Sequence, residues 1–133
     1  MHRVCSLTVL LCLVVATALA QDSAKIAPKN VKVEIDNPEV RVLRVHYDPH
    51  DKIPMHEHPD VVIVYLTDAH AKQTFPDGKT KEGQAKAGDV IFRPSVKHAA
   101  ESLSDKPIEL IEIELKCKTT ASEAATTKPA SGQ

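Results

Sequence analysis

The sequence predicts one small all-β domain, a barrel or sandwich built from short strands. Hydrophobic and polar residues alternate along several short segments of the chain, as they do in strands with one face in water. Turn-forming Pro, Gly and Asp residues separate these segments. Between residue 21 and the C-terminal tail, no window of ten or more residues shows helical periodicity. Short strands at regular intervals are typical of small barrels and sandwiches.

The expected strands begin with residues 31–35, VKVEI, which alternate strictly. Residues 40–47, VRVLRVHY, and residues 108–115, IELIEIEL, also alternate, but each run shifts phase midway. A phase shift within a strand usually marks a bulge or a bend. We therefore expect a bulge or a bend in both of these strands.

The middle of the chain adds a central strand and a hairpin. Residues 61–66, VVIVYL, are continuously apolar, as a central strand of a sheet would be. Residues 76–79, PDGK, are a tight-turn sequence between KQTF and KTKEG and predict a hairpin. Another short strand is expected at 90–93, VIFR. Tyr65 and Phe92 fall on these strands and are expected to pack in the core.

The two ends of the chain differ in composition from the middle. Residues 1–20 combine a cationic start, an apolar run and the ending ALA, the pattern of a secretory signal peptide cut before Gln21. We expect an exported protein, periplasmic or extracellular, with no membrane segment after cleavage. Residues 21–30 then lead into a barrel over 31–117, and the Thr-, Ala- and Ser-rich residues 118–133 are expected to be a disordered tail.

Composition excludes several classes of partner. Lys and Arg number 17 against 18 Asp and Glu, so neither nucleic acid nor an anionic membrane surface is an expected partner. The sequence has no Trp, two Tyr and two Phe, too few aromatic rings to stack single-stranded nucleic acid. Without the leader only Cys117 remains, so no internal disulfide can form. A small-molecule ligand or substrate, a metal and a second copy of the chain remain as expected partners.

Residues 54–60, PMHEHPD, hold the strongest signal for chemistry. Residues two apart in a strand point to the same face, so His56 and His58 project together and Glu57 points away. Two adjacent imidazoles inside a barrel need a partner that organises them, and a divalent metal does so through one nitrogen of each. The alternative is a wet strand end with two exposed histidines. His98, which follows a short strand and a Pro-containing turn, is the candidate third ligand.

Two segments resemble the paired motifs of the cupin family. HEHPDVVIVYLTDA resembles the first motif, and GDVIFRPSVKHAAES resembles the second, with Gly88, Pro94 and His98 in the expected order. The resemblance covers roughly residues 40–116. It implies a small cupin-like β-barrel, also called a jelly roll or double-stranded β-helix, whose motif histidines converge on one divalent metal. Small cupins commonly pair, and exposed barrel edges favour pairing, so we also expect a homodimer.

The motifs depart from the family pattern at several positions. His50 stands where the first motif usually has Gly, and Val62 and Ile63 stand where it usually supplies a carboxylate ligand. The second motif is one residue short, lacks its glycine and has Ser102 in place of Asn. Three neutral imidazoles without a carboxylate leave a divalent ion with its full charge, which favours anionic ligands. Such a site also keeps an open coordination position, as catalytic sites do.

Three further residues are candidates for roles near the histidines. Asp60 shares strand parity with the two histidines of HEH and is a further candidate ligand. Glu101 follows His98 by three residues and is the candidate catalytic acid or base, or an acceptor that orients a ligand. The alternative for Glu101 is a solvated loop glutamate. Arg93 either meets an anionic ligand or caps a strand.

The resemblance and the histidines together lead to two functional hypotheses. The first is an exported dioxygenase-like oxidoreductase that uses a metal at His56, His58 and His98, most naturally Fe(II), on a small organic substrate. Mn, Ni, Cu and Zn are the alternative ions, and zinc would indicate a hydrolytic or isomerase cupin. The second is a non-catalytic barrel that binds a metal or a small ligand. A barrel without any metal is the remaining alternative.

Overall fold

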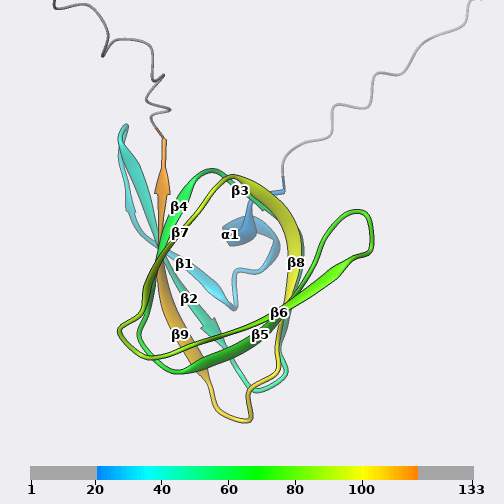
Figure 1. Ribbon diagram of the computed structural model, residues 1–133. Helices are drawn as coiled ribbons and strands as arrows, with labels where there is room; N and C mark the ends of the chain where they lie inside the picture. Colours follow the sequence, from blue (N-terminus) through cyan, green and yellow to red (C-terminus); the bar gives the residue numbers. More distant parts are fainter. Residues whose placement is uncertain (1–20, 117–133) are drawn as a thin grey trace, which may run out of the picture.

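The computed structural model describes residues 21–116 of the 133-residue chain. These residues form one short helix and nine strands (Figure 1). The predicted signal peptide and the predicted disordered tail lie outside the described residues. In chain order the elements are α1 (Ser23–Ile26), β1 (Val31–Asp36), β2 (Val40–Tyr47), β3 (Lys52–His58), β4 (Val61–Tyr65), β5 (Ala69–Thr74), β6 (Thr80–Ala85), β7 (Val90–Arg93), β8 (Val96–Ser102) and β9 (Ile108–Leu115).

The strands form two antiparallel sheets that face each other and enclose the interior (Figure 1). One sheet has five strands in the order β1-β2-β9-β4-β7, and the other has four in the order β3-β8-β5-β6. Apart from the pairs β1–β2 and β5–β6, each strand lies in the sheet opposite its predecessor in the chain. This repeated crossing is the topology of a jelly roll, in which two sheets share one core. The predicted all-β jelly-roll fold is confirmed.

The hydrophobic core fills part of the space between the two sheets. Leu43 of β2, Ile53 of β3 and Ile108 of β9 are among its most completely buried side chains. Because side chains alternate along each strand, the core takes every second residue and leaves the others to the outer faces. The remaining core members are Ala27, Val31, Val45, Val61, Ile63, Ala69 and Leu110.

Residues 21–30 pack onto the barrel and belong to the domain. Asp22 caps α1 by accepting a hydrogen bond from the backbone amide of Ala24 at 3.0 Å. The carbonyl of Gln21 accepts a hydrogen bond from the amide of Glu57 in β3, at 3.1 Å. Ala27 is part of the hydrophobic core. The lead-in is therefore fixed to the strand that carries two of the three histidines.

β2 and β9 pair without interruption. They match residue by residue along their whole lengths with no register shift, so the bulge expected in these two strands is absent from their pairing. Register shifts occur instead in β1 and β3. The phase shift in IELIEIEL marks a change in chemistry along one face. The inward side chains of β9 are apolar at Ile108 and Leu110 and acidic at Glu112 and Glu114, while its later apolar residues face outward.

The hairpin and the central strand predicted for the middle of the chain are confirmed. β5 and β6 form a hairpin whose turn is closed by a hydrogen bond from the amide of Phe75 to the carbonyl of Lys79, at 2.9 Å. Gly78 takes a φ of 81° in this turn, a conformation that glycine adopts without strain. β4 lies between β9 and β7, as expected for the continuously apolar run VVIVYL.

Phe92 faces away from the core, so its expected core position is wrong. It lies on β7 opposite Val62 of β4. Val61 and Ile63, the neighbours of Val62, are buried in the core, so alternation turns Val62 and Phe92 to the outer face of the five-stranded sheet. The Phe92 side chain is accordingly 59% exposed.

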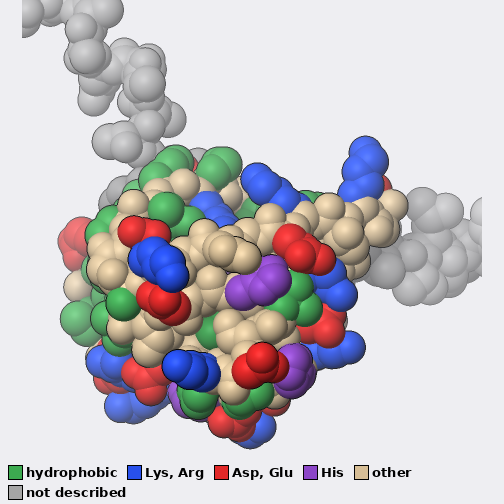
Figure 2. Space-filling model, turned by 60° about the horizontal axis from the view of Figure 1, so that its bottom comes forward, with side chains coloured by type: hydrophobic (Ala, Val, Ile, Leu, Met, Phe, Trp, Pro, Cys, Tyr) green, Lys and Arg blue, Asp and Glu red, His purple; other side chains and the backbone are tan. Residues whose placement is uncertain are grey.

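The surface carries charges of both signs. Figure 2 shows basic and acidic side chains interspersed over one face, without a large area of a single sign. Among residues 21–116, no helix is both long and apolar enough to cross a membrane.

Truncating the centre of the core should destabilise the domain strongly. Leu43 is fully buried, with 0% exposure, and we expect Leu43→Ala to lower the free energy of unfolding by about 2–5 kcal/mol through lost burial and the cavity left behind. Leu66 is 42% exposed, and Leu66→Ala is the matched control with an expected change of less than about 1 kcal/mol. Urea unfolding followed by circular dichroism measures both. Equal effects of the two substitutions would contradict the assigned core.

Candidate metal centre

The structure brings His56, His58 and His98 together on one inner face. β3 and β8 are neighbours in the four-stranded sheet, and their register sets His56 directly opposite His98. His58 follows two residues later on the same face of β3. The three residues are only 2%, 3% and 6% exposed, respectively. Their ring centroids lie 4.6 to 5.5 Å apart, so the rings form one buried cluster.

Hydrogen bonds fix which nitrogens of two rings face the cluster. The Pro54 carbonyl can only accept, so Nδ1 of His56 donates to it at 2.7 Å. Nδ1 of His58 donates to Oε1 of the Glu114 carboxylate at 3.0 Å. When both rings are neutral, with their protons on Nδ1, their Nε2 lone pairs face each other, and these two nitrogens are 2.9 Å apart.

This donor set fits a divalent metal. Two nitrogens that each bind one metal at about 2.1 Å, at right angles, lie about 3.0 Å from each other. The separation of the two Nε2 atoms matches this spacing. His98 adds a buried Nδ1 that has no hydrogen-bond partner among the described residues, and one ligand atom from each of the three histidines lies within 4.8 Å of the others. Imidazole nitrogen is a donor that Zn, Cu, Fe and Ni accept.

Burial and nearby charges shift the pKa values of the three rings. Burial, and after it the neighbouring histidine rings, lowers the pKa of His98 from 6.5 to about 3. Burial also lowers the pKa of His56. At His58 burial lowers the pKa, but the hydrogen bond to Glu114 and the charge of Glu112 outweigh burial, and the net pKa is raised. His56 and His98 are therefore neutral at pH 7, the form that binds metals.

Two carboxylates of β9, which the sequence reasoning missed, lie beside His58. Glu114 accepts the hydrogen bond described above, and Oε2 of Glu112 lies 3.7 Å from Nδ1 of His58. Both approach the nitrogen that points away from His56, so they orient the ring and leave its Nε2 free to bind a metal. The phase shift in IELIEIEL is the signal that could have revealed them, because it places glutamates on the inward face.

A chain of charges extends from Glu114 to the lead-in. Arg41 of β2 stands directly opposite Glu114 in register, with Nη1 3.6 Å from Oε2 of the carboxylate. The same guanidinium donates two hydrogen bonds to the Asp22 carboxylate, at 3.0 and 3.1 Å. The network of hydrogen bonds and ion pairs that holds His58 therefore spans β3, β9, β2 and the residue that caps α1.

Asp60 and Glu101 lie apart from the three histidines. The Asp60 carboxylate accepts a hydrogen bond from the amide of Ser95 at 2.8 Å, and Asp60 does not line the cavity beside the histidines. Glu101 alternates with the inward residues of β8, faces outward and pairs with Lys72 at 2.7 Å and Lys52 at 3.3 Å. The hydrogen bond with Lys72 lowers the pKa of Glu101. Neither carboxylate contacts the histidine cluster.

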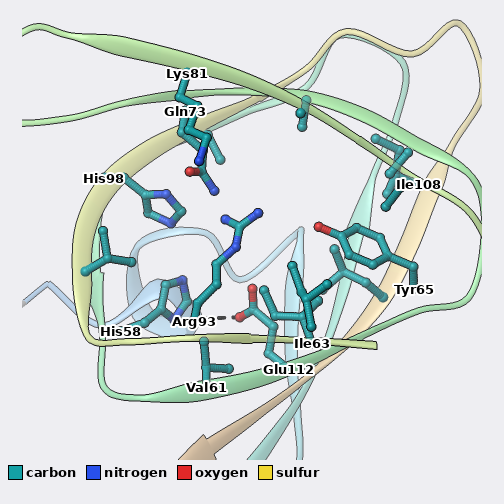
Figure 3. Close-up of a pocket in the computed structure, with 18 of the residues that line it drawn as sticks. His58, Val61, Ile63, Tyr65, Gln73, Lys81, Arg93, His98, Ile108 and Glu112 are labelled. Atoms are coloured by element: carbon teal, nitrogen blue, oxygen red, sulfur yellow. Dashed lines mark ion pairs between the residues drawn. The ribbon is translucent and has the colours of Figure 1, made fainter. Parts of the chain in front are cut away.

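The histidines form one wall of a cavity of about 440 Å³. This volume lies within the usual range for small-molecule sites, about 300–1,000 Å³. Figure 3 shows His58 and His98 on one side of the cavity, Tyr65 and Ile108 on the other, and Arg93 between them. The apolar part of the lining consists mainly of Val61, Ile63, Ile91, Ile108 and Leu110, and the polar part includes Tyr47, Tyr65, Gln73, Arg93 and Glu112.

Comparisons with known proteins support the same fold. No protein-family model matches the sequence, and no curated protein matches it either. Among solved structures, a cupin domain from Bordetella pertussis Tohama I is 30% identical, with a TM-score of 0.61 over 65% of this chain and 92% of that one. This chain belongs to the cupin superfamily. An uncharacterized conserved protein with a double-stranded β-helix domain from Klebsiella pneumoniae is 20% identical, with a TM-score of 0.53 over 65% of this cupin and 75% of that chain, and shows the fold alone.

The stability of the metal-free cupin should decrease as the pH falls from about 6.5 to about 5. In this window the unfolded chain protonates His98, whereas the folded protein, in which the pKa of His98 is about 3, does not. Folding is then coupled to proton release, and the free energy of unfolding falls by about 1.4 kcal/mol per pH unit for this one group. His56, with a lowered pKa, acts in the same direction.

Comparison of variants isolates the contribution of His98. Glu112, whose pKa burial raises, opposes the trend, and His58 acts mainly above pH 6.5. Urea unfolding in chelator at several pH values should therefore show a weaker pH dependence for His98→Gln than for the unsubstituted protein. His46→Gln, on the outer face of β2, should keep the original dependence. An unchanged slope in His98→Gln would contradict the buried neutral ring.

Proposed function

We propose that this protein is an exported cupin that binds one divalent metal through His56, His58 and His98 and oxidises a small organic substrate with O₂. One observation carries the proposal. Three buried imidazoles, two of them with their Nε2 atoms 2.9 Å apart, meet at the wall of a cavity of about 440 Å³. A metal held there by three protein ligands keeps open positions for other ligands, as catalytic sites do.

The metal we propose is Fe(II). When bound, a redox-active divalent ion supplies the electrons that activate O₂ toward an organic molecule, whereas zinc supplies a hydrolytic nucleophile. Three neutral imidazoles leave the charge of the ion uncompensated, which favours anionic ligands. Ni and Cu also bind imidazole nitrogen, and Mn, Ni and Cu are the alternative redox metals.

Residues of the chain would bind the substrate and handle its protons. Burial raises the pKa of Glu112, so its carboxyl group retains a proton to higher pH than an ordinary glutamate and can exchange it with a bound molecule. The apolar walls exclude water from the reacting groups. Glu112 replaces Glu101 as our candidate acid or base, because Glu112 lines the cavity and Glu101 does not.

The metal content of the exported protein tests this proposal. The full chain is expressed for export without a tag or chelator, its N-terminus is read by mass spectrometry, and the metal is measured by inductively coupled plasma mass spectrometry. We expect cleavage before Gln21 and about one equivalent of iron, with at least tenfold less in His56→Ala and His98→Ala. His46→Ala, on the outer face of β2, is the control that should retain the metal.

The outcomes separate the alternatives. Iron that both cavity variants lose, followed by oxygen uptake with small organic compounds, would support the oxidoreductase. Zinc in place of iron would indicate a hydrolase or an isomerase. Bound metal without turnover of any substrate would indicate a non-catalytic binding protein. No metal, or metal retained by both variants, would overturn the three-histidine centre, provided that urea unfolding shows both variants to be folded.

A further inference from the structure

Arg93 points into the cavity beside the histidines. It ends β7 and stands opposite Val61 of β4, whose side chain is almost completely buried in the core. Paired residues of neighbouring strands share a face, so Arg93 faces inward as well. In Figure 3 its guanidinium lies near the centre of the cavity, between the ring of His98 and the hydroxyl of Tyr65, with the amide of Gln73 nearby.

The guanidinium of Arg93 has no carboxylate partner within 4.0 Å among residues 21–116. The other two arginines of this part of the chain do: Arg41 pairs with Asp22 and Glu114, and Arg44 with Glu34 and Glu109. Arginine carries five N–H donors and keeps its charge in proteins. A charge held in a partly closed cavity without a counter-charge is unfavourable, and an anionic ligand would remove that penalty.

None of the three acidic side chains that line the cavity, Glu82, Asp89 and Glu112, forms an ion pair with Arg93 within 4.0 Å. Glu112 lines the same cavity, but it lies close to Nδ1 of His58, at 3.7 Å, and forms no ion pair with Arg93 within 4.0 Å. The positive charge of Arg93 is therefore available to a bound molecule.

We propose that the cavity binds a small organic carboxylate, with its carboxylate group on the Arg93 guanidinium and its carbon body against the apolar wall. This proposal depends on the proposed function in one respect only: it treats the bound carboxylate as the substrate. The planar fork of arginine matches the two oxygens of a carboxylate. The Tyr65 hydroxyl and the Gln73 amide can donate further hydrogen bonds from the same cavity. The apolar lining beyond them suits a hydrocarbon body better than a phosphate group.

Calorimetric titration of the exported full-length protein with benzoate and with benzamide tests the proposal. The two probes have nearly the same shape, and only benzoate is charged. We expect benzoate to bind at least tenfold more tightly than benzamide. Arg93→Gln should weaken the affinity for benzoate at least tenfold and change the affinity for benzamide by less than twofold. Arg44→Gln makes the same substitution on the outer face of the same sheet and should leave both probes unchanged.

The controls separate this proposal from the metal centre. Metal content and the urea midpoint are measured for each variant, and Arg93→Gln should keep both. If the protein contains no metal but binds benzoate through Arg93, the carboxylate site is supported and the metal proposal fails. Equal binding of the two probes, unchanged benzoate binding in Arg93→Gln, or tighter Arg93-dependent binding of inorganic phosphate would overturn the carboxylate assignment.

Discussion

The structure depends on one cross-strand pair, His56 of β3 opposite His98 of β8. This register places two imidazoles side by side on an inner face, and alternation along β3 adds His58 as the third. Buried rings at this distance must be neutral or share a cation, because like charges in a low-dielectric interior repel strongly. Burial, and after it the charges of the neighbouring rings, lowers the pKa values of His56 and His98. The neighbouring glutamates, the arginines and the cavity are arranged around it.

The second sheet completes the site by orienting one ring. His58 belongs to the four-stranded sheet and Glu114 to the five-stranded sheet, so their hydrogen bond joins the two layers. Glu114 is itself buried and paired with Arg41. Buried ionic groups rarely gain net stability over apolar residues of similar volume. We interpret this unit as a device that fixes the tautomer and direction of His58, a role expected of groups behind a metal ligand.

A single strand can supply both core residues and site residues to the interior. The inward face of β9 begins with Ile108 and Leu110 in the core and continues with Glu112 and Glu114 beside the histidines. A strand exchanges apolar for polar residues on one face without changing its backbone, because side chains on that face recur every second residue. The apolar residues displaced from the inner face of β9 appear on its outer face.

The sequence by itself determined most of the strands, the PDGK hairpin, the all-β barrel or sandwich class and the common face of His56 and His58, because these follow from local periodicity and turn chemistry. The jelly-roll topology was implied by the resemblance to the cupin motifs. The sequence also singled out His98 through its motif. Only the tertiary structure decided which residues meet across strands: His98 with His56, Glu114 with His58, and Arg93 within the cavity. The bulges expected in β2 and β9 and the core position of Phe92 failed for the same reason. Which face of a strand turns inward is set by its register with strands distant in sequence, and local alternation does not contain that information.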